Sequence, residues 1–382
     1  MIGPAVLLAA ILAAGGQAAA ASDAYARAVA LQQAGDREGA AAAYRELLKA
    51  QPSHVAARSN LGVVLAQLGR YEEAIETYRA ALAVDPKQHR IRLNLGIALY
   101  KAALYGDAVT ELAAVRTAEP DNLQARYLEA DCHLRMGAPK QVIELLAPLE
   151  PTRQDDLALA YMLGLAYFQE KEMEKGGVLV DRILKRGESA EAHLMLGMAK
   201  RGGGDLSGGL EALGKAVALN PELPGVHSLY GRALLETGNR DRAQAEFEAE
   251  LARNPLDFDA HLYLGVLLKE DAQYDAAMAH FERALGVRPG DPGVRYQMVT
   301  IYVSRGETER ALPLLEAIVK EAPAFLEAHV TLATVYYRLK RREDGDRERA
   351  IVDALNKEIQ AKQPGAVAPN TPETPPARTP GH

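Results

Sequence analysis

The chain has 382 residues and a formal net charge of −7 at pH 7, with acidic and basic side chains interspersed along it. No basic stripe is present, which argues against a nucleic-acid-binding surface, because such a surface needs clustered Lys and Arg. The single cysteine, Cys132, excludes an internal disulfide framework and has no catalytic partner near it in sequence.

The first predicted element is a leader over residues 1–21. An apolar run over residues 6–14 is followed by two glycines and then by alanines. This order predicts a secretory signal peptide that is cleaved after about Ala20 or Ala21. No Lys or Arg precedes the apolar run. Two alternatives therefore stay open, namely a retained membrane anchor and an ordinary first helix.

Prolines recur downstream at a fixed interval. Within each of two groups they lie 34 residues apart, and the gap between the groups is three periods less one residue. A period of this size indicates a stacked repeat array, in which each unit packs only against its neighbours. The recurring prolines are Pro52, Pro86, Pro120, Pro221, Pro255, Pro289 and Pro323.

Ten helix pairs follow when these prolines are placed at position 32 of a 34-residue unit. Positions 8 and 20 are each Gly or Ala in nine of the ten units, which predicts the point where the two helices of a unit cross closely. Position 15 is glycine in six units and is expected to end the first helix in the left-handed conformation. The units begin near Ala21, Val55, His89, Leu123, Leu157, Ala190, Pro224, Phe258, Pro292 and Leu326.

The array is expected to end in a capping helix from about Asp346 to Lys362, because a terminal repeat needs a solvated outer face. Residues 363–382 contain six prolines and three threonines, a composition that predicts a disordered tail. The side chains of the capping helix that are expected to face the array are Ile351, Val352, Leu355 and Ile359.

The second unit resembles a tetratricopeptide repeat through residues 60–86, NLGVVLAQLGRYEEAIETYRAALAVDP, and nearly all of residues 22–357 follows the same pattern. The resemblance is looser in the fourth unit, where Pro148 and Pro151 replace the usual ending, and in the last two units. It implies an all-α fold, a right-handed superhelix (TPR solenoid) of about ten helix pairs over residues 22–362. Family members usually bind proteins or peptides in a concave groove lined by the first helix of each pair, and most have no catalytic activity of their own.

The candidate groove residues are Asn60, Arg90 and Asn94. Asn60 and Asn94 occupy position 6 of successive units, where the resemblance implies an amide that faces the groove and can both donate and accept hydrogen bonds. Arg90 lies one turn before Asn94. Contact with a peptide and simple surface polarity both stay open as interpretations. In later units the residue at position 6 is apolar, which suits either an adaptable partner surface or packing between units. These residues are Leu128, Met162, Met195, Leu229 and Tyr263.

Four histidines recur at position 4, but neighbouring units should place them about 10 Å apart, the spacing of packed helices. That spacing is too wide for one zinc ion, whose ligand nitrogens lie about 2.1 Å from the metal. We expect packing positions and no metal site. The glycine-rich stretch over residues 201–209 has no preceding strand, so we expect a turn and not a phosphate loop. The histidines are His193, His227, His261 and His329.

These features predict a non-enzymatic scaffold, without cofactor, that binds a protein or an extended peptide in its groove. Together with the leader they place it outside the cytoplasm, in the periplasm of a bacterium, in envelope assembly or secretion. A retained leader would anchor it to the membrane instead. The alternative function is a helper or regulatory subunit of an enzyme complex, such as a glycosyltransferase or a polysaccharide-export machine.

Overall fold

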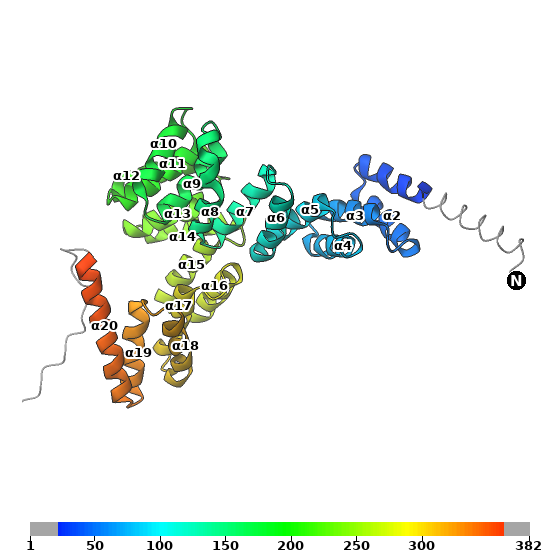
Figure 1. Cartoon of the computed structure of the whole chain (residues 1–382). Coiled ribbons are helices and arrows are strands. Elements are labelled where there is room, and N and C mark those ends of the chain that lie inside the picture. The colour runs from blue at the N-terminus through cyan, green and yellow to red at the C-terminus, as the bar shows by residue number, and fades with distance from the viewer. Residues whose placement is uncertain (1–21, 363–382) are drawn as a thin grey trace, which may run out of the picture. The chain divides into compact units, whose positions relative to one another are not determined.

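The computed structural model describes residues 22–362, and this part of the chain is helical without any strand (Figure 1). The prediction of an all-α solenoid of helix pairs is confirmed. None of the helices in the described part is both long and apolar enough to cross a bilayer. The signal peptide or anchor expected over residues 1–21 and the tail expected over 363–382 lie outside the described residues.

The first of two compact units ends at Asp257. After a helix described over residues 22–33, consecutive helices pair as antiparallel neighbours joined by short turns. These helices are α2 (Arg37–Ala50), α3 (Val55–Gln67), α4 (Tyr71–Val84), α5 (His89–Lys101), α6 (Tyr105–Ala118), α7 (Leu123–Arg135), α8 (Pro139–Leu146), the 3₁₀ helix η1 (Ala147–Thr152), α9 (Leu157–Gln169), α10 (Met173–Leu184), α11 (Ala190–Gly202), α12 (Leu206–Leu219), α13 (Val226–Glu236) and α14 (Arg240–Arg253).

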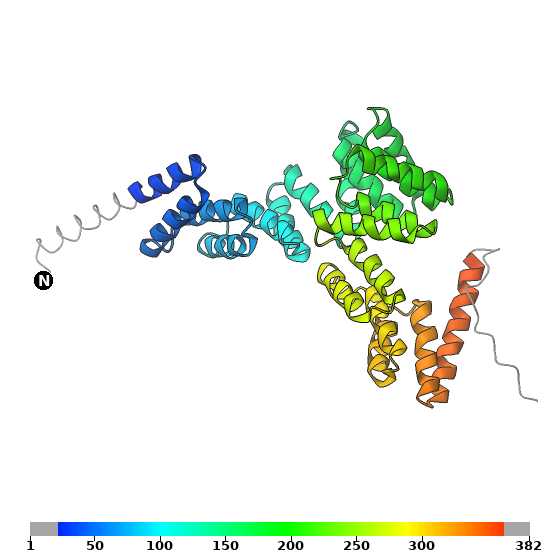
Figure 2. The same cartoon turned by 180° about the vertical axis from the view of Figure 1, so that it is seen from behind.

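The second compact unit begins at Phe258 and repeats the same pairing (Figure 2). Its helices are α15 (Phe258–Glu270), α16 (Tyr274–Val287), α17 (Pro292–Ser304), α18 (Thr308–Glu321), α19 (Leu326–Arg338) and α20 (Arg342–Lys362).

Every turn within a helix pair contains one residue with a left-handed backbone. The six glycines at position 15 have φ between 69° and 87°, so that prediction is confirmed. In the other four units a residue with a side chain adopts the same conformation, with φ between 56° and 62°. A side chain in this region costs about 1–2 kcal/mol, which makes these four turns strained. The four residues are Ala103, Lys171, Ala272 and Lys340.

The small residues at position 8 allow a large side chain of the second helix to lie on the backbone of the first. A Cβ added to Gly62 would lie 2.4 Å from the ring of Tyr78, and one added to Gly265 would lie 2.5 Å from Phe281. Tyr78 and Phe281 are both fully buried. The predicted crossing point is confirmed, since any larger residue at position 8 would displace the ring.

Some side chains at position 4 make polar contacts with their own unit and with the proline carbonyl of the unit before it. The Arg92 guanidinium donates to Glu111 at 2.5 Å and to the carbonyl of Pro86 at 3.2 Å. His329 repeats this pattern: its Nδ1 lies 2.5 Å from Glu348 Oε2 and its Nε2 lies 3.1 Å from the carbonyl of Pro323. The four position-4 histidines are buried, which confirms the packing interpretation. No group of three or more potential ligands within residues 22–362 is placed to hold a metal ion.

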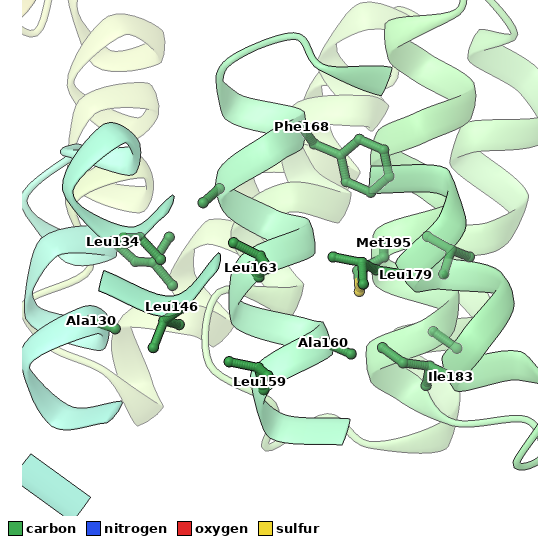
Figure 3. Packing of buried hydrophobic residues seen from close by; sticks show 14 residues of the cluster. Ala130, Leu134, Leu146, Leu159, Ala160, Leu163, Phe168, Leu179, Ile183 and Met195 are labelled. Atoms are coloured by element: carbon green, nitrogen blue, oxygen red, sulfur yellow. The ribbon is translucent and has the colours of Figure 1, made fainter. Parts of the chain in front are cut away.

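The core of the middle units is continuous from α7 to α11 (Figure 3). Met195 is 0% exposed and lies beside Leu179, with its methyl group over the backbone of Gly164. For this methionine the packing interpretation is correct, and an exposed partner surface is excluded. Cys132 of α7 is buried as well, and burial raises the pKa of its thiol to about 12.

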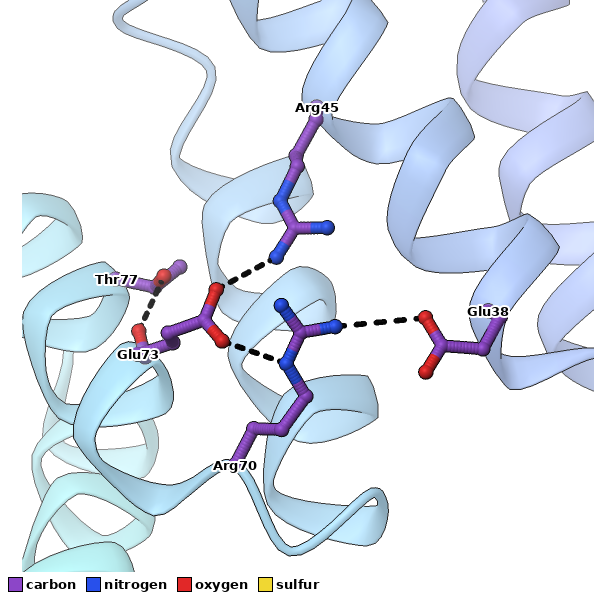
Figure 4. A network of polar contacts seen from close by, with 5 residues as sticks. All are labelled: Glu38, Arg45, Arg70, Glu73 and Thr77. Carbon is purple, nitrogen blue, oxygen red and sulfur yellow. Dashed lines mark hydrogen bonds and ion pairs between the residues drawn. The ribbon is translucent and has the colours of Figure 1, made fainter.

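Polar contacts reinforce the stacking of the second helices in the N-terminal units (Figure 4). Glu73 of α4 accepts from Arg45 of α2 at 2.8 Å and from Arg70 at 2.6 Å. Arg70 also reaches Glu38 of α2 at 3.4 Å. These side chains are largely exposed, so each pair contributes little to stability.

The capping helix differs from the prediction. α20 begins at Arg342, four residues before the expected start at Asp346. Ile351 and Ile359 are 39% and 41% exposed, so the prediction that both face the array is wrong. For Ile359 the physical reason is length: α20 has 21 residues and its antiparallel partner α19 has 13, which leaves about 12 Å at the C-terminal end of α20 without a helix to cover it.

Within the stretch over residues 201–209, residues 203–205 form the predicted turn between α11 and α12, and the others lie in the two helices. Gly204 has a φ of 87°, and Asp205 caps α12 by accepting from the amide of Gly208 at 2.8 Å.

Candidate peptide-binding groove

Asn60 lies on α3, half-buried, and its amide is already engaged. Its Nδ2 donates to the hydroxyl of Tyr25 at 3.0 Å and to that of Tyr44 at 3.2 Å. Tyr44 is fully buried and donates onward to Gln32 at 2.7 Å. Both amide protons therefore tie α3 to the preceding helix pair. A ligand could use only the side-chain oxygen of Asn60.

Arg90 and Asn94 lie on α5, which packs beside α3. Arg90 is exposed and Asn94 is half-buried. Among the described residues, neither side chain takes part in a hydrogen bond or an ion pair. These two groups thus keep their donors and acceptors for a ligand, whereas Asn60 does not keep its donors. Contact of the three residues with a peptide stays a prediction.

A cavity of about 470 Å³ opens farther along the same unit. One wall comes from the end of α5, with Tyr100 and Lys101, from the start of α6, with Tyr105, and from Arg135 of α7. The opposite wall comes from the segments that follow α12 and α14 and from Glu250 and Arg253 within α14. The two walls come from parts of the chain that are far apart in sequence.

The first wall is a closed polar and aromatic cluster. The Tyr100 hydroxyl donates to Asp131 Oδ2, and Arg135 Nε donates to the same oxygen at 2.9 Å. The Arg135 guanidinium lies 5.3 Å from the ring centroid of Tyr100 and 5.7 Å from that of Tyr105. Burial, with the Asp131 carboxylate, raises the pKa of the Tyr100 hydroxyl. The positive charge of Arg135 is therefore balanced within the wall itself.

The opposite wall contains a buried carboxylate. Glu250 is 2% exposed, and its Oε1 accepts from the amide of Gly225, the N-cap residue of α13, at 2.9 Å. Burial raises the pKa of Glu250, and the nearby Asp257 carboxylate raises it further. Arg253 does not serve as its counter-ion, since its Nε donates to Glu222 at 2.8 Å.

Sequence reasoning missed this cavity, although one signal was present. Glu250 occupies position 27 of its unit, a position that is otherwise apolar. A single acid in an apolar column requires a compensating contact, because a buried charge is costly. Residues at this position in other units include Leu47, Ala81, Val115, Ala216, Ala284, Ile318 and Val352.

Two family models, both described as tetratricopeptide repeat, match this chain. One matches residues 25–89 and 229–292, and the other matches residues 65–119, 99–165 and 268–324. No curated protein sequence matches it.

Three solved structures are similar to this chain at low identity. The structure titled as the APC/C hetero-tetramer Cut9–Hcn1 is 14% identical with a TM-score of 0.54, over 91% of this chain and 82% of that one. A tetratricopeptide repeat protein from Parabacteroides merdae is 15% identical with a TM-score of 0.47, over 67% and 97% of the two chains. A structure reported in a functional characterization of Pseudomonas aeruginosa pilF is 22% identical with a TM-score of 0.43, over 58% and 99%.

Proposed function

Because the chain belongs to the tetratricopeptide repeat family, we propose that it is a scaffold that binds a protein or an extended peptide in the groove of its first helices. Such repeats serve protein–protein interaction, and their groove is built from equivalent faces of successive units. The finer part of the proposal is that the N-terminal units recognise the backbone of an extended ligand.

The observation that supports this proposal is that two polar side chains of α5 have no hydrogen-bond partner among the described residues. Asn94 and Arg90 have no partner among the described residues, although many of the exposed charged side chains around them are paired, as Arg79 is with Asp107. An amide can bond both the donor and the acceptor of a peptide group. An extended ligand rises about 3.3 Å per residue, so it could reach Asn94 and the free oxygen of Asn60, about 10 Å away, within three residues.

We further propose that the protein acts outside the cytoplasm, in envelope assembly or secretion. The support is the apolar leader over residues 1–21 and the small residues that end it. A helper subunit of an enzyme complex is the second candidate. It is supported only by the lack of a catalytic motif in a chain that the repeat array fills.

Crosslinking in the native host followed by mass spectrometry would identify the partner. The binding test then compares the parent with the double variant Arg90→Ala and Asn94→Ala, for which we expect about thirtyfold weaker binding, because two lost hydrogen bonds at about 1 kcal/mol each amount to about 2 kcal/mol. Arg37→Ala is the matched control, since Arg37 is exposed at the start of a second helix. Unchanged affinity in the double variant would place the contact elsewhere. Copurification with an enzyme would favour the helper subunit.

Substitution of Asn60 is expected to affect stability as well as binding, so it is tested separately. Asn60→Ala removes two hydrogen bonds to buried or half-buried tyrosines, so it should lower stability by about 1–2 kcal/mol in addition to any effect on binding. Thermal unfolding of this variant separates the two effects.

A further inference from the structure

We propose that the cavity between the α5–α6 turn and α14 receives a basic side chain, Lys or Arg, of a bound peptide, with Glu250 as its counter-ion. This inference rests on the proposed function, because it names the chemistry of the segment that the scaffold would recognise. It concerns residues at the turn end of the helix pairs, and none of them is among the three groove residues predicted from the sequence.

The size and walls of the cavity suit one long side chain with part of its backbone. Its volume of about 470 Å³ lies within the range of about 300–1,000 Å³ that is usual for ligand sites. Tyr100 and Tyr105 provide aromatic surface on one side, and Leu256, which is 40% exposed, provides apolar surface on the other. Such walls fit the aliphatic stem of Lys or Arg, which packs on apolar surface while its charged end reaches a polar group.

The charges of the cavity leave Glu250 as the group that needs a partner. Arg135 is paired with Asp131, and Arg253 is paired with Glu222. Lys101 has no acidic partner among the described residues, but it is exposed, so water solvates its ammonium group. Glu250 is buried, where water cannot solvate its charge, and a carboxylate in that position gains most from a cation.

Capping of α13 explains only part of what Glu250 does. The amide of Gly225 needs an acceptor, and an uncharged Gln would provide one. The N-terminus of a helix carries about half a positive charge, which offsets the carboxylate incompletely. Besides burial, the Asp257 carboxylate, which accepts from the hydroxyl of Ser228 at 2.6 Å, raises the pKa of Glu250, while the nearby His227 lowers it. The incomplete offset at the helix N-terminus therefore leaves Glu250 able to gain from a cation in the cavity.

The test uses the full chain and three fluorescent peptides, acetyl-Ala-Leu-X-Pro-Ala-amide, in which X is arginine, citrulline or glutamate. Citrulline has nearly the shape of arginine without its charge. We expect the arginine peptide to bind about tenfold more tightly than the citrulline peptide, as for a charge that meets a buried partner, and the glutamate peptide to bind most weakly. Fluorescence anisotropy at low and at physiological salt measures all three.

Glu250→Gln should abolish the preference for arginine while it keeps an acceptor for the amide of Gly225. Glu222→Gln is the matched control, because it removes an exposed acid of the same cavity, and it should change affinity by less than about threefold. Circular dichroism verifies that both variants fold. The proposal is overturned if the citrulline peptide binds as tightly as the arginine peptide, or if Glu250→Gln retains the preference.

A surface substitution gives a test that does not depend on α13. Lys101→Glu reverses a charge at the exposed edge of the cavity and should strengthen binding of the arginine peptide about two- to threefold at low salt. Weaker binding of the arginine peptide would contradict the proposed position of the ligand.

Failure of this inference can be told apart from failure of the scaffold function. If crosslinking captures a partner but the peptides do not differ, the cavity does not select a basic side chain and the scaffold function stands. If the arginine peptide is preferred through Glu250 but the double variant Arg90→Ala and Asn94→Ala binds the captured partner as tightly as the parent, the cavity is a binding site and the proposed groove contact is wrong.

Discussion

The α3–α4 pair and the pairs from α9 to α12 build the same architecture from different sequences. α4 contains no glycine, whereas α10 contains Gly176 and Gly177, and α12 contains three more. The family models match the chain through residue 165 and again from 229, which leaves residues 166–228 unmatched. Helix pairs form in both stretches. The fold thus depends on the glycines at the crossing points and tolerates additional ones.

A second contrast lies in how neighbouring units join. At the α4–α5 junction, Leu82 at position 28 of the second unit and Leu95 at position 7 of the third are both buried. At the α6–α7 junction the corresponding residues are charged: Arg116 donates to Glu129 at 2.8 and 3.1 Å. Glu129 is only 4% exposed. An ion pair between a buried carboxylate and a half-buried guanidinium takes the place of an apolar contact here, and the cost of burying the Glu129 charge is offset only while Arg116 is present.

The largest expected effect is at this junction. Arg116→Leu should destabilise the chain by about 3–5 kcal/mol because Glu129 is left unpaired, whereas Arg116→Leu with Glu129→Leu should match or exceed the parent. Denaturant unfolding measures both. Arg79→Leu is the control, since its pair with Asp107 is exposed and should matter little. A double variant as unstable as the single one would contradict this explanation of the pair.

Two adjacent glycines of α10 should respond in opposite directions. A Cβ on Gly176 would lie 2.4 Å from the ring of Phe168, so Gly176→Ala should destabilise by about 1–3 kcal/mol. A Cβ on Gly177 would meet nothing within 4 Å, so Gly177→Ala should stabilise by about 1 kcal/mol. Thermal unfolding gives the sign, and hydrogen exchange shows whether the gain stays within α10. The same sign for both variants would refute the distinction between crossing and additional glycines.

The turns provide a smaller test. Lys171 between α9 and α10 has a φ of 62°, and Gly69 between α3 and α4 has a φ of 74°. Lys171→Gly should stabilise by up to about 1 kcal/mol, because relief of backbone strain exceeds the added freedom of the unfolded chain. Gly69→Ala should destabilise by a similar amount. If Lys171→Gly lowers the melting temperature, contacts of the lysine outweigh its strain.

The smallest effect belongs to the exposed network of Figure 4. The hydrogen bond from Arg70 lowers the pKa of Glu73. A lowered pKa in the folded state means that the contribution of Glu73 is present above its unfolded pKa of about 4.3 and is lost as pH falls below that value. Glu73→Gln should therefore lower the melting temperature at pH 7 by less than about 2 °C, and the difference should vanish at pH 3. A larger shift at pH 3 than at pH 7 would reverse the assigned sign.

Several features could be predicted because they depend on neighbouring residues. The left-handed turn at Gly204 follows from the absence of a side chain, and the close crossing at Gly62 follows from a small residue facing a large one. The exposed end of α20 could not be predicted from its pattern. Ile351 and Ile359 have the spacing of a buried face, but burial of Ile359 requires a partner helix, and α19, which runs antiparallel and begins at Leu326, is too short to reach the C-terminal part of α20.

For the candidate site, too, some features could be predicted from the sequence and others could not. The sequence placed Asn60 and Asn94 in one column but could not reveal that Tyr25 and Tyr44 take both amide protons of Asn60. Likewise, the acid at position 27 was visible, whereas its position beside a cavity was not.

The sequence by itself determined the period, the helix pairs and the close crossings, because each depends on residues within one unit and the same pattern recurs in the other units. Only the tertiary structure decided which charges are balanced and where a cavity opens. Tyr100 and Glu250, on opposite walls, are 150 residues apart. The rotation between successive units brings them to one cavity. That rotation results from many small packing contacts between units, and no short segment of the sequence contains them all.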